Sequence, residues 1–86
     1  MTVVRMDTVL WELGKFYHKK HLEDHPDSGV SVSFTVMNTL LALEENGDVV
    51  KHLDADGSVT WKATPKLLAF FEGGAGRLVA FGPSLH

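Results

Sequence analysis

Four short clusters of turn-forming residues divide this 86-residue chain and keep every helix or strand short. The clusters are Asp24–Gly29, Asn46–Asp48, Asp54–Gly57 and Gly73–Gly76. Glycine, proline, asparagine and aspartate at this density favour tight turns, because they accept backbone angles that regular elements do not use. No repeat, low-complexity tract or linker separates the segments between them. We therefore expect a single domain over residues 1–86.

Composition excludes several classes of protein. The chain has no cysteine, which rules out a disulfide scaffold, a thiolate metal site and a cysteine nucleophile. Hydrophobic residues make up 44% and charged residues 22%, as in globular proteins. The apolar runs fall short of the roughly 18 residues that span a bilayer, and the N-terminal residues lack the apolar core of a signal peptide. We therefore expect a cytoplasmic protein with no membrane partner.

The first segment predicts an amphipathic helix from about Asp7 to Leu22. Asp7 or Thr8 stands where a cap or a first-turn acid belongs. Gly14 lies inside this helix, where it either costs about 1 kcal/mol relative to alanine or permits the close approach of a neighbouring element. The apolar residues recur at three- and four-residue spacing and form one stripe. The stripe consists of Met6, Val9, Leu10, Leu13, Phe16 and Tyr17.

The second segment opens with the alternating residues Val30–Phe34, which favour a short strand or an extended entry. A helix is then predicted from about Phe34 to Asn46, with Ser33 or Thr35 as its cap and Gly47 as the left-handed residue that ends it. We expect its buried face to contain Phe34, Met37, Leu40 and Leu41. The free face would carry Ser33, Thr35, Asn38, Thr39 and Ala42.

The third and fourth segments, Val49–Leu53 and Ser58–Ala63, alternate or are β-branched, and the turn residues Asp56-Gly57 between them predict a β-hairpin. Thr64-Pro65 is typical of an N-cap followed by a proline at the first helical position.

A short helix is expected from Pro65 to Glu72, ended by Gly73, and a last strand from Arg77 to Phe81. The predicted order is helix, extended segment, helix, hairpin, helix and strand.

The order of helix, hairpin and helix is the most specific feature of the chain. The run from Leu43 to Lys51 ends a helix and enters the hairpin, and the run from Trp61 to Lys66 enters the next helix. Over about Ser33 to Phe71 the chain resembles winged helix-turn-helix proteins, particularly bacterial and archaeal regulators of the multiple-antibiotic-resistance type. The resemblance implies an α+β fold that is winged helix-like, with a small helical core and a two-stranded β-hairpin wing. It also implies a transcriptional regulator or accessory factor that binds double-stranded DNA.

Recognition of DNA by such a helix requires one buried face and one face free for base edges. Serine, threonine and asparagine can hydrogen-bond to base edges, and asparagine suits adenine best. The expected base contacts are Ser33, Thr35, Asn38 and Thr39. Lysines of the hairpin and of the helix behind it would contact phosphates. The expected phosphate contacts are Lys51, Lys62 and Lys66.

Three histidines, His18, His21 and His25, follow one another at spacings of three and four residues. Imidazoles on one helical face could hold a transition metal. The alternative is a polar helix terminus at which the helix dipole favours cations, and we prefer it, so we expect no metal and no cofactor. The neighbouring lysines Lys15, Lys19 and Lys20 could form a phosphate-facing patch, but we prefer to explain them by the same dipole and by solubility.

Trp11 lies off the apolar stripe of the first helix, which predicts that its ring is partly exposed. An exposed aromatic side chain beside an amphipathic helix often marks an interface. A chain this short also builds only a modest core. We therefore expect a homodimer formed through the first helix, with Trp11 and Tyr17 at the interface.

No nucleophile elbow, carboxylate pair or Ser–His–Asp order indicates an enzyme, and we expect none. A second function stays open beside DNA binding. The hairpin tip Asp54–Asp56 is acidic, the net charge is −3, and the helix that would read DNA has no arginine. These features favour a winged helix-like protein–protein interaction module, such as a phage- or plasmid-type inhibitor or an assembly adaptor. A neutral or negative face on Phe34–Asn46 would favour this second function over DNA binding.

Overall fold

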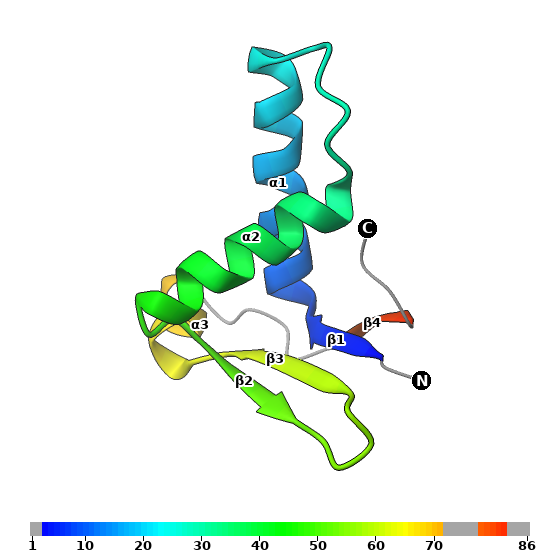
Figure 1. Ribbon diagram of the computed structural model, residues 1–86. Helices are drawn as coiled ribbons and strands as arrows, with labels where there is room; N and C mark the ends of the chain where they lie inside the picture. Colours follow the sequence, from blue (N-terminus) through cyan, green and yellow to red (C-terminus); the bar gives the residue numbers. More distant parts are fainter. Residues whose placement is uncertain (1–2, 72–77, 83–86) are drawn as a thin grey trace.

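The computed structural model describes residues 3–71 and 78–82 (Figure 1). Three helices and four strands follow one another in this part of the chain. In chain order they are β1 (Val4–Asp7), α1 (Thr8–Asp24), α2 (Val32–Glu45), β2 (Val49–Leu53), β3 (Val59–Ala63), α3 (Pro65–Phe70) and β4 (Leu78–Gly82). The fold is α+β, as the sequence predicts.

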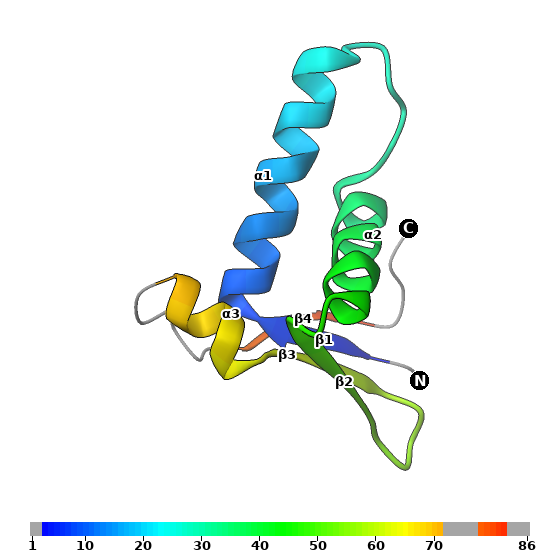
Figure 2. The ribbon, with the colours of Figure 1, turned by 90° about the vertical axis from the view of Figure 1, so that its left-hand side faces the viewer.

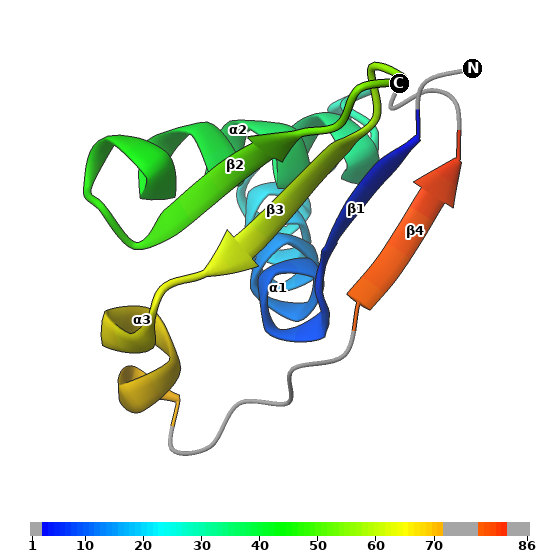
Figure 3. The same cartoon turned by 90° about the horizontal axis from the view of Figure 1, so that it is seen from below.

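The strands form one mixed sheet in the order β2-β3-β1-β4. β1 pairs with β3 in parallel, with Val4 opposite Val59, and antiparallel with β4. β2 and β3 form the predicted antiparallel hairpin, and Gly57 adopts the left-handed angle (φ +87°) that its turn requires. α1 and α2 lie on one face of the sheet (Figures 1 and 2), and no described element covers the other face (Figure 3).

β1 is absent from the sequence prediction, which placed Met6 at the start of the helical stripe. The side chains of Val4 and Met6 are both buried and alternate with the half-buried Arg5, so this segment follows the two-residue period of a strand. Asp7 precedes α1 at the predicted cap position, but its carboxylate makes no cap hydrogen bond. Asp7 Oδ2 instead accepts a hydrogen bond from the backbone N–H of Ala63 at 2.8 Å and extends the β1–β3 pairing by one step.

No strand forms over Val30–Phe34: Ser31 has the extended backbone of the predicted entry (φ −77°, ψ 157°), and α2 begins at Val32. Ser31, and not Ser33 or Thr35, is the N-cap, and its Oγ accepts a hydrogen bond from the backbone N–H of Phe34 at 3.1 Å. The cap satisfies a backbone N–H that the helix itself leaves without a partner. This stabilisation of the helix outweighs the weak strand preference of Val30–Phe34. At the other end Gly47 has φ +77°, as predicted for the residue that ends this helix.

Replacement of Ser31 by alanine removes this cap, and we expect the free energy of unfolding to fall by about 1 kcal/mol. Ser33→Ala, two residues further on, removes a hydroxyl that does not cap the helix and is the matched control. Urea unfolding followed by circular dichroism measures both variants. Equal losses from the two substitutions would contradict the assignment of the cap to Ser31.

The core lies between the helices and the sheet. Its fully buried side chains are Met6, Leu10, Val36, Leu40 and Val49, joined by Val4, Trp61 and Leu67. α1 and α2 cross at Gly14, where a Cβ atom would lie 2.5 Å from Cγ2 and 3.0 Å from Cα of Val36. Gly14 therefore permits a close approach of the two helices, which is one of the two roles that the sequence leaves open.

The predicted buried face of α2 is wrong in two of its members. Phe34 and Leu41 are exposed, Met37 is half-buried, and Val36 and Leu40 supply the buried contacts. Apolar residues surround most of α2, so two stripes are available, and the contact of Val36 with Gly14 selects between them. The predicted stripe of α1 likewise ends early, because Phe16 and Tyr17 are exposed.

The remaining elements follow the predictions closely. Thr64 precedes α3 and Pro65 opens it, as predicted, although the Thr64 hydroxyl donates to the backbone oxygen of Asp48 at 3.0 Å and does not cap the helix. β4 occupies Leu78–Gly82, close to the predicted strand. The predicted stop at Gly73 and the turn Gly73–Gly76 lie outside the described residues.

Candidate interaction surface

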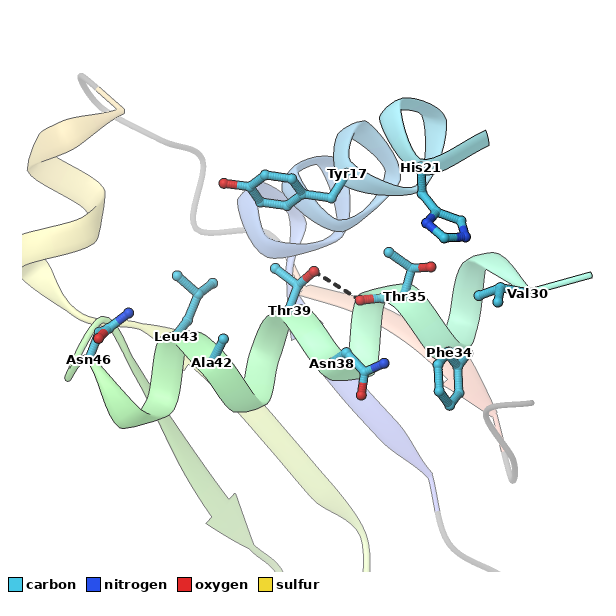
Figure 4. Close-up of a pocket in the computed structure, with 10 residues that line it drawn as sticks. All are labelled: Tyr17, His21, Val30, Phe34, Thr35, Asn38, Thr39, Ala42, Leu43 and Asn46. Carbon is cyan, nitrogen blue, oxygen red and sulfur yellow. Dashed lines mark hydrogen bonds between the residues drawn. The ribbon is translucent and has the colours of Figure 1, made fainter. Parts of the chain in front are cut away.

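A groove of about 470 Å³ runs between α1 and α2 (Figure 4). Its α1 wall carries Tyr17 and His21, and its longer wall follows α2 from Phe34 to Asn46. A second hollow of about 380 Å³ lies between α1, the end of α2 and α3, and Phe70 stands on its rim. Tyr17 and Leu43 line both hollows, so the two are neighbours on the helices.

The shape of this surface follows from the crossing at Gly14. α1 is buried only at Leu10 and Gly14, in its first half, and its second half extends beyond α2 (Figures 1 and 2). The two helices therefore diverge from their contact point, and the side chains between them do not fill the space. The groove is a direct consequence of a long helix that meets a shorter one near its middle.

Two histidines of α1 lie within hydrogen-bond distance of residues in α2 and in the α1–α2 connection. His18 Nδ1 lies 3.2 Å from Thr35 Oγ1, and His21 Nε2 lies 2.9 Å from Ser28 Oγ. Ser28 Oγ also accepts a hydrogen bond from the backbone N–H of Val30, so its own hydrogen is available to a neutral His21 ring. The rings of His21 and His25 are 5.0 Å apart. Within residues 3–71 and 78–82, no group of three histidine or acidic side chains is arranged to hold a metal ion.

Of the four expected base contacts, Asn38 is the one that lies fully on the exposed face of α2. Ser33 is half-buried. The Thr39 hydroxyl donates to the backbone oxygen of Thr35 at 2.9 Å (Figure 4). The Thr35 hydroxyl lies within hydrogen-bond distance of Ser31 O and His18 Nδ1. Both threonines therefore face the groove, and their hydroxyls have partners inside the molecule.

The three expected phosphate contacts are exposed but do not share one face. Lys51 stands opposite Trp61 and Lys62 opposite Val50 in the hairpin, and successive side chains of a strand point to opposite sides. Lys51 Nζ lies 5.6 Å from the centre of the Trp61 ring. Lys66, at the start of α3, lies 3.5 Å from Asp48 Oδ1 in an ion pair. The structure does not gather these lysines beside the exposed face of α2.

Charge on the surface of α2 is absent along most of its length and negative at its end. The helix has no Lys, Arg or His, and its two acids, Glu44 and Glu45, are its last residues. The hairpin tip adds further negative charge. The backbone N–H of Ser58 donates to Asp56 Oδ1 at 2.9 Å and, with the Ser58 hydroxyl, holds the pKa of Asp56 below its usual value.

Exposed apolar side chains lie on all three helices: Tyr17 and Phe34 line the groove, Phe70 lines the second hollow, and Leu41 lines neither. Phe34 is 55% exposed, Leu41 45%, Tyr17 47% and Phe70 79%. We call these four residues the helix surface. The sequence prediction places Tyr17 at an interface but Phe34 and Leu41 in the core. The signal it missed is their spacing of seven residues, which puts them on the same side of α2 as Asn38.

Trp11, which the sequence predicts at an interface, packs against the sheet in the structure. Its ring is half-buried and packs edge to face on Phe81 of β4, with ring centres 4.6 Å apart. Lys15 Nζ lies 5.6 Å from the centre of the Trp11 ring. Trp11 thus extends the core between α1 and the sheet edge, and Tyr17 is the more accessible of the two residues.

Among the described residues, no helix combines the length and the apolar character needed to cross a bilayer. Comparisons with protein-family models, with curated proteins and with solved structures found no match to this chain.

Proposed function

We propose that this chain is a winged helix-like protein–protein interaction module whose partner binds the helix surface. The packed pair α1 and α2, followed by the β2–β3 hairpin, supports the winged helix-like description. One observation carries the function. Four large apolar side chains of the three helices stay exposed, three of them in the two hollows, while the threonines expected to contact bases make hydrogen bonds within the molecule. Exposed apolar side chains gathered at hollows are typical of sites of protein contact.

Affinity capture tests this function. The tagged full-length chain is incubated with an extract of the cells that encode it, and the retained proteins are compared with those retained by a Leu41→Ala variant. Leu53→Ala is the matched control, because Leu53 is also exposed but lies at the end of β2 away from the helix surface. We expect Leu41→Ala to lose a specifically retained protein that wild type and Leu53→Ala keep. Identical retention by all three would refute the module.

DNA binding is the second candidate, and the exposure of Asn38 in the middle of α2 favours it. In that case Asn38→Ala would remove sequence preference, and Lys62→Ala would weaken binding to all duplexes and lower the salt slope by about one.

A titration with random duplex DNA at two salt concentrations separates the two candidates. Because α2 carries no cation, we expect little binding and no steep salt dependence. Binding that falls sharply between the two concentrations, and that Lys62→Ala weakens, would instead establish the DNA-binding candidate.

A further inference from the structure

We infer that the free edge of β2 binds an extended peptide of another protein, which adds a fifth strand to the sheet and carries basic residues at both of its ends. The contact goes beyond the proposed function, because backbone groups of β2 make it and the helix surface takes no part in it. Three observations carry the inference: the direction of the β2 backbone groups, the regularity of the strand, and the acidic residues at its two ends.

Hydrogen bonds at the two ends of the hairpin show which residues of β2 face β3. Just before β2, the backbone N–H of Thr64 donates to Asp48 O at 2.9 Å. Just after it, the backbone N–H of Asp54 donates to Ser58 O at 2.8 Å. Hydrogen-bonded and non-hydrogen-bonded residues alternate along an antiparallel pair. The even-numbered residues of β2 therefore bond to β3, and the odd-numbered residues turn their N–H and C=O groups to the opposite side.

Lys51 and Leu53 present these outward groups to solvent. Both residues are exposed, whereas Val49, the other odd-numbered residue of β2, is buried. β2 is the last strand of the sheet on this side (Figure 3), so no strand among the described residues pairs with the outward groups of Lys51 and Leu53. A row of outward donors and acceptors at strand spacing is complementary to another extended backbone, which is how a peptide adds a strand to a sheet.

β2 lacks the features by which many natural edge strands avoid further pairing. Those features include proline, a bulge, or a charged side chain that extends over the edge. The five residues of β2 include no proline, and their register with β3 is regular throughout. Lys51 Nζ lies 5.6 Å from the centre of the Trp61 ring, over the sheet and away from the free edge. Val50 and Leu53 are 53% and 66% exposed, so an added strand would also cover apolar surface.

Acidic side chains stand at both ends of this edge. Glu44 and Glu45, the exposed last residues of α2, come shortly before β2. Asp54 and Asp56 follow β2 in the hairpin tip, where Asp54 Oδ1 lies 3.3 Å from His52 Nε2. Among the described residues, neither glutamate forms an ion pair. A strand that lies along β2 therefore extends from one negative end to the other, and basic residues at its ends complement both.

The same charges disfavour a second copy of this chain as the added strand. Antiparallel pairing of β2 with its own copy sets the hairpin-tip acids of one chain beside Glu44 and Glu45 of the other. Parallel pairing sets each acidic end beside its like. Because like charges oppose association, the acids that repel a copy of β2 attract a foreign peptide with basic ends.

Amide hydrogen exchange of the free full chain, followed by nuclear magnetic resonance, tests the direction of the backbone groups. We expect the N–H groups of Lys51 and Leu53 to exchange at least about tenfold faster than those of Val50 and His52, which bond to β3. Equal protection of all four in dilute solution would show that the edge is already paired and would overturn the inference. Protection of Lys51 and Leu53 that appears only as the concentration rises would assign the edge to a second copy and overturn it as well.

Peptides selected on the full chain from a phage-displayed library of random ten-residue sequences are the probe for binding. We expect the selected peptides to carry lysine or arginine on both sides of an uncharged centre. A synthetic peptide of such a sequence is expected to protect the N–H groups of Lys51 and Leu53 from exchange. Failure to select any peptide that protects these two groups would overturn the inference.

Lys51→Pro and Lys51→Ala form a matched pair, because both remove the lysine side chain and only proline removes the outward N–H. In fluorescence anisotropy with the labelled peptide, we expect Lys51→Pro to raise the dissociation constant by about tenfold or more and Lys51→Ala by less than about threefold. The lost N–H makes no hydrogen bond to β3, and circular dichroism verifies that the variant is folded.

N-methylation of alternate residues of the peptide applies the same test from the side of the ligand. We expect methylation of the N–H groups that pair with β2 to abolish binding, and methylation of the intervening groups to leave it. Equal effects of Lys51→Pro and Lys51→Ala, together with equal effects of the two methylation patterns, would overturn strand addition.

Charge reversal tests the basic ends of the peptide. We expect Glu45→Lys to weaken binding by about three- to fivefold. Asp27→Lys makes the same change of net charge in the α1–α2 connection, and we expect it to change the dissociation constant by less than about twofold. Equal effects of the two substitutions would show that net charge alone attracts the peptide and would contradict the placement of its basic ends.

The helix surface is distinguished from the β2 edge by Leu41→Ala. A peptide whose binding is lost in Leu41→Ala but kept in Lys51→Pro occupies the helix surface. That result would overturn the inference for β2 and support the proposed function. A peptide with the reverse behaviour occupies the edge of β2, as we expect.

Discussion

Replacement of Gly14 by alanine lowers the free energy of unfolding by about 1 to 2 kcal/mol. The new methyl group would lie 2.5 Å from Val36 Cγ2 and 3.0 Å from Val36 Cα, so α1 and α2 must move apart. Overpacking of this kind costs about 1 to 3 kcal/mol, and more where backbone must shift. The better helix propensity of alanine returns about 1 kcal/mol and does not reverse the sign. Chemical unfolding followed by circular dichroism measures the loss.

A double-mutant cycle with Val36→Ala identifies the contact responsible. Val36→Ala alone leaves a cavity and costs about 2 kcal/mol. Because it also removes the atom nearest to the new methyl group, the double variant loses at least about 1 kcal/mol less than the sum of the single losses. Gly29→Ala is the control for glycine replacement in general, since nothing lies within 4 Å of a Cβ atom there. Additive losses would mean that the helices are not in contact at Gly14.

Replacement of Asp7 by alanine is expected to cost about 2 to 3 kcal/mol. The carboxylate is 7% exposed and accepts the hydrogen bond of the Ala63 N–H. Its removal leaves a backbone donor without a partner at the point where β1 ends beside β3. A hydrogen bond to a charged group contributes about 1.5 to 3 kcal/mol, and an unsatisfied buried donor has a similar cost.

Asp7→Asn separates the hydrogen bond from the charge. Its side-chain oxygen can still accept from Ala63, so we expect it to lose about half as much as Asp7→Ala. Asp27→Ala removes an exposed acid in the α1–α2 connection and should stay within about 0.5 kcal/mol of wild type. Loss of stability that is the same for Asp7→Ala and Asp27→Ala would show that net charge, and not the bond to Ala63, is responsible.

Local signals in the sequence predict most of the elements. The β2–β3 hairpin follows from Asp56-Gly57, the start of α3 from Thr64-Pro65, and the end of α2 from Gly47. Each of these depends on residues close together in the chain. β1 could not be predicted, because its partners, β3 and β4, lie far along the sequence. Its four residues alone do not distinguish a strand from the start of a helical stripe.

The candidate site is harder to predict for a related reason. α2 is apolar on most sides, and the side that is buried depends on which residue of α2 meets Gly14 of α1. Periodicity within α2 gives no information about this contact. A rotation of the helix by about one residue moves Phe34 and Leu41 out of the buried face and Val36 into it, while Leu40 stays buried, and this changes the chemistry of the exposed face.

The position of β1 between β3 and β4 has a consequence for how the chain acquires its structure. The first strand to be synthesised has an inner place in the sheet, and its parallel neighbour lies 55 residues later, as the Val3–Ser58 contact illustrates. Contacts that distant slow folding, since a long loop must close before they form. On the ribosome, α1 and α2 can associate early. β1 can pair with its two neighbouring strands only after residues 59–63 and 78–82 have been synthesised.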